Sequence, residues 1–170
     1  MLVRQIPALA FLPANNIPQA FDQIKITFPA EANEIVEWFE ENYVHGRPRR
    51  SLRAGVVVRS PPLFPPAFWS VVDNMEYTFP RTQNSVEAWH RRWDTLVGSA
   101  HIGIFKIIKK LQKEQNQVEL EIEANVRGAP RPPQKRQVIE RENRIQTVFN
   151  NWDNMSLEDF LRGIAHNIML

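Results

Sequence analysis

The sequence predicts an all-α protein, built as an irregular array of helices. Apolar residues recur at spacings of three and four through most of the 170 residues. Prolines and glycines mark the ends of most of these periodic segments. Residues 55–58 (Gly-Val-Val-Val) favour one short β-strand, for which the sequence shows no obvious partner.

The first half of the chain predicts a series of short helices. Residues 2–12 have helical spacing, but Pro7 lies inside the pattern, so a helix here starts late or is kinked. A second helix follows Asn16, a capping residue type, with Pro18 in its first turn. A further helix begins at Ala67, where apolar residues again recur at three and four.

The third helix is predicted between Glu34 and Tyr43. We expect its apolar stripe to face the core and its glutamates to face water. The stripe consists of Ile35, Trp38, Phe39 and Tyr43, and the glutamates are Glu34, Glu37, Glu40 and Glu41. Gly46 and Pro48 end this helix, and a connector with two di-proline pairs follows.

The second half contains the best-defined predicted helix, residues 84–97. Asn84 is expected as its N-cap, Glu87 follows three residues later, and Gly98 ends it. Its predicted buried stripe is Val86, Trp89, Trp93, Leu96 and Val97. Together these signals predict a capped amphipathic helix.

A long helix is predicted from about residue 101. Its segment 118–124 (VELEIEA) alternates and also fits a strand, although we favour a helix. The Pro- and Arg-rich residues 126–136 predict a linker, followed by a helix over 135–150. A last helix starts at Ser156, where Ser-Leu-Glu-Asp resembles a capping box.

Composition excludes several classes of protein. The absence of cysteine excludes a disulfide scaffold, a cysteine nucleophile and thiolate-bound zinc. No apolar run approaches the roughly 20 residues of a membrane span, and the first residues do not resemble a secretion signal. We therefore expect a soluble intracellular chain without a membrane partner. The predicted segments are residues 1–58, 59–125, 126–136 and 137–170.

Charge is balanced overall but segregated along the chain. The 21 basic and 19 acidic residues give a net charge of +2. Arginines concentrate in residues 45–53 and 126–136, whereas acids concentrate in 30–41 and 117–125. The first cluster consists of Arg47, Arg49, Arg50 and Arg53. It predicts either phosphate contacts with DNA or a solvated loop, and residue types alone leave both open.

The sequence offers few signs of catalytic chemistry. Six glycines form neither a phosphate-binding loop nor a dinucleotide fingerprint, and the four histidines include no zinc-binding pair. On the predicted helix 84–97, four polar residues share one face: Glu87, His90, Arg91 and Asp94. This face has two interpretations. It is a solvated face with a capping box and a Glu87–Arg91 ion pair, or Glu87 belongs to a metal-dependent nuclease centre.

Residues 61–98 resemble the carboxyl-terminal part of transposases of the Mutator-like element class, the animal proteins that often carry FLYWCH-type zinc fingers. The matching residues are Pro61, Pro62, Phe64, Pro65, Trp69, Pro80, Arg81, Thr82, Asn84, Glu87, Trp89, His90 and Arg92. Gln83 departs from the family pattern, which has asparagine there. Residues 8–24, 45–50 and 111–115 fit the same family, so the resemblance spans most of residues 3–120.

The resemblance implies an RNase H-like fold that holds two Mg²⁺ or Mn²⁺ ions on Asp, Asp and Glu. Glu87 matches the final glutamate, with Thr82, Asn84 and His90 as supporting residues. None of the five aspartates matches the two family aspartates, which lie upstream of the matched region. The resemblance therefore implies helical insertions and tail without the catalytic sheet or the finger module. It also implies that the chain alone binds no cofactor and cleaves no DNA.

Three functions follow as expectations. The chain is a transposase-derived fragment, found in the nucleus by family resemblance, and it binds DNA weakly. The expected phosphate contacts are the arginines of residues 45–53 together with Arg81, Arg91 and Arg92. The alternative is a helical protein-interaction module that self-associates. Trp38, Trp69, Trp89 and Trp93 would then be interface anchors, although tryptophans at helical spacing also fit a core.

Overall fold

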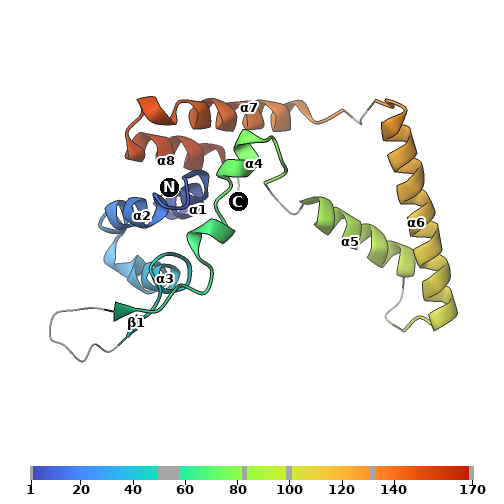
Figure 1. Ribbon diagram of the computed structural model, residues 1–170, viewed down its shortest axis with the longest axis horizontal. Coiled ribbons are helices and arrows are strands. Elements are labelled where there is room, and N and C mark those ends of the chain that lie inside the picture. Colours follow the sequence, from blue (N-terminus) through green and yellow to red (C-terminus); the bar gives the residue numbers. More distant parts are fainter. Residues whose placement is uncertain (1, 50–57, 82–83, 99–100, 131–132, 169–170) are drawn as a thin grey trace. The chain divides into compact units, whose positions relative to one another are not determined.

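A computed structural model describes residues 2–49, 58–81, 84–98, 101–130 and 133–168 (Figure 1). The described residues are mostly helical, which confirms the predicted all-α class. The chain forms two compact units. Unit 1 consists of residues 1–81 and 136–170, and unit 2 of residues 82–135.

Unit 1 combines helices from both ends of the chain. Its α-helices are α1 (Gln5–Ala8), α2 (Ile17–Lys25), α3 (Asn33–Phe39), α4 (Val72–Glu76), α7 (Arg136–Asn150) and α8 (Leu157–Asn167). Its 3-10 turns are η1 (Leu2–Arg4), η2 (Leu9–Phe11), η3 (Ala30–Ala32), η5 (Pro66–Phe68) and η6 (Trp152–Asn154). A π-helical turn, η4 (Glu40–Val44), extends α3.

The core of unit 1 lies where α8 meets α1 and α7 (Figure 1). Phe160, Leu161 and Ile164 of α8 are completely buried, and so are Leu9 and Phe21 from the amino-terminal helices. The amphipathic pattern of α8 produces this contact, because its apolar residues recur at three and four. The sequence predicted four separate segments, whereas the amino-terminal and carboxyl-terminal helices share this core.

The amino-terminal end of α8 confirms the predicted cap at Ser156. The Ser156 hydroxyl accepts a hydrogen bond from the backbone N–H of Asp159 at 3.1 Å. This bond satisfies one of the free N–H groups of the first helical turn. Gly98 likewise ends α5 (Asn84–Val97) as predicted, with a positive φ of 72° and its N–H bonded to the carbonyl of Asp94.

The third predicted helix forms, but its buried face differs from the prediction. Ile35 and Trp38 are more than half exposed, whereas Val36, Glu40 and Val44 are buried. A buried residue at every fourth position defines a face that the apolar stripe did not predict.

Unit 2 is a pair of helices, α5 and α6 (Ile104–Val126). The structure shows residues 118–124 as helix, as the sequence analysis favoured. The predicted buried stripe of α5 is wrong, because Val86 and Trp89 are exposed and Trp93, Leu96 and Val97 are only partly buried. Two helices alone have too few neighbours to enclose these side chains. Asn84, predicted as the N-cap that precedes the helix, is instead the first helical residue of α5.

None of the helices within the described ranges has the combined length and apolar character that a bilayer crossing requires.

Candidate nucleic-acid interface

A short β-hairpin carries the arginine cluster. Strand β1 (Pro48–Arg49) pairs in antiparallel fashion with β2 (Val58–Arg59), and Arg49 lies opposite Val58. The hydrogen bond from Ser60 N–H to the carbonyl of Arg47, at 2.9 Å, continues the pairing. Val58, the last residue of the predicted strand, therefore has a partner that the sequence did not reveal. Residues 55–57 lie outside the described residues.

A buried carboxylate anchors the base of this hairpin. Glu40 is 6% exposed, and its carboxylate pairs with Arg59 at 2.8 Å and with Lys25. Arg59 also donates a hydrogen bond to the carbonyl of Gly46 at 3.0 Å. A buried carboxylate requires such partners, because an unpaired charge in the interior costs several kcal/mol. The two cations therefore attach the hairpin to α2 and η4.

Gly46 fits the tight turn that leads from η4 into β1. Its φ is +81°, a conformation that side chains rarely adopt. A Cβ atom at this position would lie 1.7 Å from the carbonyl oxygen of Ser60. Only glycine allows the two backbone segments to approach this closely. The sequence analysis placed Gly46 as a helix end, which the structure confirms.

An aromatic cluster supports the same turn from the other side. The rings of Phe39 and Tyr43 stack at 5.0 Å, and Tyr43 stacks on Phe64 at 5.1 Å. The indole N–H of Trp69 donates to the carbonyls of Tyr43 and Phe64, at 3.2 and 3.1 Å. Phe64 and Trp69, two residues of the transposase-like motif, therefore have a packing role in this structure.

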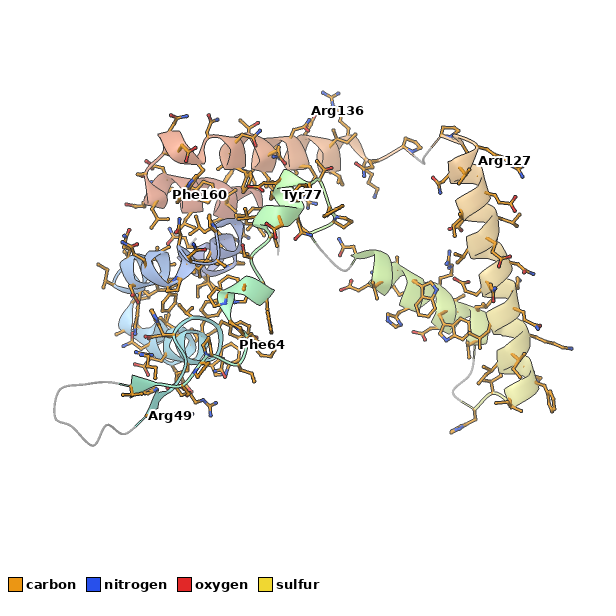
Figure 2. The ribbon with its side chains drawn as sticks, in the orientation of Figure 1. Arg49, Phe64, Tyr77, Arg127, Arg136 and Phe160 are labelled. Atoms are coloured by element: carbon orange, nitrogen blue, oxygen red, sulfur yellow. The ribbon has the colours of Figure 1, made fainter. Side chains whose placement is uncertain are left out.

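The hairpin places exposed arginines at the edge of unit 1. Figure 2 labels Arg49 on β1, and this side chain is exposed. The Arg47 side chain is 69% exposed and lies 3.5 Å from the carboxylate of Glu41. Arg50 and Arg53 lie outside the described residues. Arg49 on β1 and Arg47 directly before it thus hold two guanidinium groups where a ligand in solvent can reach them.

Arg81 is placed differently from the hairpin arginines. Its side chain is 17% exposed, pairs with Glu142 of α7 and stacks over the ring of Phe11 at 5.3 Å. Its guanidinium group is therefore engaged within unit 1 by a carboxylate and an aromatic ring. We assign Arg81 a role in holding α7 against the amino-terminal helices, rather than the phosphate contact predicted from the sequence.

The other predicted site residues belong to unit 2. Glu87 is largely exposed and lies 3.7 Å from Arg91, which confirms the ion pair predicted at that spacing. Arg92 pairs with Glu114 and Glu121 of α6. Asn84 and His90 are exposed, and Thr82 lies outside the described residues.

The donor side chains do not fit the family's two-metal centre. Within the described residues, the one group of three or more close donors is Asp22, Glu40 and His45, and Glu87 is not among them. Asp22 bonds to His45 at 2.8 Å, and Glu40 already pairs with two cations. A divalent ion here would have to displace them. As the sequence analysis expected, the aspartates lie on helical segments, not on strands: Asp22, Asp73, Asp94, Asp153 and Asp159.

Sequence reasoning missed Glu40 as the central residue of this region. It was assigned to the water-facing side because it is charged. The available signal was its position four residues from both Val36 and Val44, which places it on a buried face.

Comparisons with protein-family models, with curated proteins and with solved structures find no match for this chain.

Proposed function

We propose that this chain is a DNA-associated, transposase-derived fragment that binds DNA through the paired strands β1 and β2 with the adjacent Arg47, and does not cleave it alone. The resemblance of residues 61–98 to Mutator-like transposases motivates the origin, including descent from an RNase H-like enzyme and a place in the nucleus. The observation that carries the DNA contact is the anchored hairpin with exposed Arg47 and Arg49.

A two-stranded ribbon is a suitable shape for this role. The major groove of B-DNA, about 12 Å wide, admits such a ribbon. Guanidinium groups bind phosphate oxygens in a planar, bidentate geometry and release counterions as they do so. Because Glu40 holds Arg59 at the base of the hairpin, the strand enters the complex already ordered.

The lack of cleavage follows from the surroundings of Glu87. This carboxylate is exposed and pairs with Arg91. Two-metal phosphodiester chemistry needs several carboxylates within a few ångströms of one another. Purified protein incubated with duplex DNA and Mn²⁺ should therefore show no nicking above that of the Glu87→Ala variant. Nicking that depends on Glu87 would refute this part of the proposal.

DNA binding is tested by fluorescence anisotropy with labelled duplex DNA over a series of salt concentrations. The test variant changes Arg47 and Arg49 to glutamine. The matched control changes two exposed arginines elsewhere, Arg127 and Arg136, so that the net charge falls equally. If Arg47 and Arg49 each contact a phosphate, the test variant reduces the salt slope by about 1.8.

The control variant is expected to keep the slope and most of the affinity. Equal losses in the two variants would show that only net charge matters, which contradicts a hairpin site. Absence of salt-dependent binding by the unmodified chain would refute the proposed function altogether.

A second candidate function, a helical interaction module, is favoured by one specific observation. Helix α6 exposes many large apolar side chains, among them Phe105, Leu120 and Ile122. Soluble monomers rarely leave such surface contiguous and uncovered.

A further inference from the structure

A cavity of about 260 Å³ lies among α1, α2 and α8 of unit 1, and we name it the α1–α8 cavity (Figure 1). Its lining combines apolar and polar side chains, among them Ile24, Leu157, Ala165, Gln5, Glu158 and Arg162. An apolar cavity of roughly 150 Å³ holds one benzene molecule, which has six heavy atoms. By that measure the α1–α8 cavity has room for a ligand of about ten heavy atoms.

Gln5 presents a buried amide to this cavity. The residue is only 8% exposed, and its side chain forms no hydrogen bond with the part of the chain that the structure describes. Among those same residues, the one completely buried side-chain nitrogen or oxygen without a partner is Nε of Arg141. The amide of Gln5 is therefore still reached from solvent, through the cavity that it lines.

The chemistry of this amide indicates which group it pairs with. Few buried amides in native proteins are left without a partner, because the loss of hydration is then uncompensated. A carboxamide offers one acceptor oxygen and one donor N–H₂ side by side. The group that satisfies both at once is a second carboxamide. A ligand that ends in such a group therefore fits the Gln5 end of the cavity.

An ion pair lies at the mouth of the α1–α8 cavity. Glu158 and Arg162 are one turn apart on α8, and they pair with each other while both side chains remain more than half exposed. A guanidinium group has five N–H donors and a carboxylate has two acceptor oxygens, so each can bind a further charged group. Adjacent positive and negative charges are complementary to a ligand that carries a carboxylate and an ammonium on the same carbon.

We propose that the α1–α8 cavity binds a free α-amino acid whose side chain ends in a carboxamide, with L-glutamine as the best fit. The ligand carboxylate pairs with Arg162, and its ammonium pairs with Glu158. Its methylene groups pack beside Ile24 and Leu157, and its carboxamide pairs with Gln5. The proposal goes beyond DNA binding, because none of these residues belongs to the hairpin.

This arrangement predicts a definite order of preference among ligands. L-methionine has a linear side chain of similar length, but it leaves the amide of Gln5 without a partner. L-glutamate brings a charge next to a buried neutral group, which costs more than an amide does. We expect the unmodified chain to bind L-glutamine about tenfold more tightly than either of them, with a dissociation constant in the millimolar range.

The test is a titration of the full, ¹⁵N-labelled chain with each amino acid, followed by nuclear magnetic resonance. L-glutamine should shift the side-chain N–H₂ signals of Gln5. The Gln5→Met variant keeps the length of the side chain and removes the amide. It should lose about tenfold in affinity for L-glutamine and bind L-methionine at least as tightly. Gln19→Met is the matched control, because Gln19 is exposed on α2 and does not line the cavity.

The contribution of the ion pair is tested with Arg162→Gln, which should weaken L-glutamine binding by about tenfold. Arg127→Gln is its control, because Arg127 pairs with Glu123 on α6 at the same spacing and should leave binding unchanged. Circular dichroism verifies that the variants keep their helix content. Absence of any shift at the Gln5 amide with L-glutamine would overturn the proposal. Equal affinity of the unmodified chain for L-glutamine and L-methionine would overturn it too, whether or not the variants fold.

Discussion

Replacement of Glu40 by glutamine tests whether the buried carboxylate holds the hairpin in place. The substitution keeps the shape of the side chain and removes its charge. The carboxylate side chain is 8% exposed, while those of its partners Lys25 and Arg59 are 38 and 35% exposed. The neutral amide can still accept one hydrogen bond, but it no longer attracts two cations.

The expected cost follows from these exposures. Removing one member of a fully buried ion pair costs 3–5 kcal/mol, roughly, because the other charge is left without a partner. Lys25 and Arg59 each retain about a third of their contact with water, so they regain hydration when the charge is lost. Loss of hydrogen bonds to a charged group, about 1.5–3 kcal/mol, is then the better guide. We expect Glu40→Gln to lower the free energy of unfolding by about 2 kcal/mol.

Thermal and urea unfolding, followed by circular dichroism, measure this loss. A cost of about 2 kcal/mol corresponds to a melting temperature lower by roughly 8 °C for a unit of this size. Glu41→Gln is the matched control, because this neighbouring glutamate is 38% exposed and its nearest cation, Arg47, is 3.5 Å away. It should cost less than about 0.5 kcal/mol. Equal stability of the two variants would refute the anchoring role of Glu40.

Two further predictions concern local backbone structure. Gly46→Ala should destabilise the protein by about 3 kcal/mol or more, because its Cβ would collide with the carbonyl oxygen of Ser60. Gly128→Ala is the control, because Gly128 has a similar φ of +78° but no atom lies within 4 Å of the added Cβ. It should lower the free energy of unfolding by only about 1 kcal/mol. The difference between the two variants, measured by denaturant unfolding, separates the cost of the collision from that of backbone strain. Ser156→Ala should cost about 1 kcal/mol in the same assay, because the N–H of Asp159 loses its acceptor. An unchanged unfolding midpoint would show that solvent replaces this cap without cost.

Most of the predicted helices are confirmed because their signals are local. The helix predicted from Ala67 is wrong in its start, because Pro66–Phe68 forms a 3-10 turn and α4 spans only Val72–Glu76. Apolar spacing marks α6 and α8, the Ser156 cap starts α8, and Gly98 ends α5. Each signal acts within one or two helical turns, so it does not depend on the rest of the fold. The alternating pattern of residues 118–124 does not produce a strand, because the helix that begins at Ile104 continues through this segment.

The candidate site was harder to predict, because its parts come from distant positions. Arg47 and Arg49 were identified by composition alone, and the structure places Arg49 on the exposed strand β1, with Arg47 directly before that strand. Arg81 was grouped with them, yet its surroundings include Glu142, 61 positions away along the chain. The charge of a residue predicts an affinity for opposite charge. It does not predict whether that partner lies in the protein or in a ligand.

The sequence by itself determined the helical class, the position of most helices and the position of the arginine cluster, since all three depend on neighbouring residues. Only the tertiary structure decided that Glu40 is buried and that residues 58–59 pair with 48–49. It also decided that large apolar side chains of α6, such as Leu111 and Ile122, are exposed. These features depend on which segments meet in space. Lys25 and Arg59 neutralise Glu40 from 15 and 19 positions away, and no local pattern carries that information.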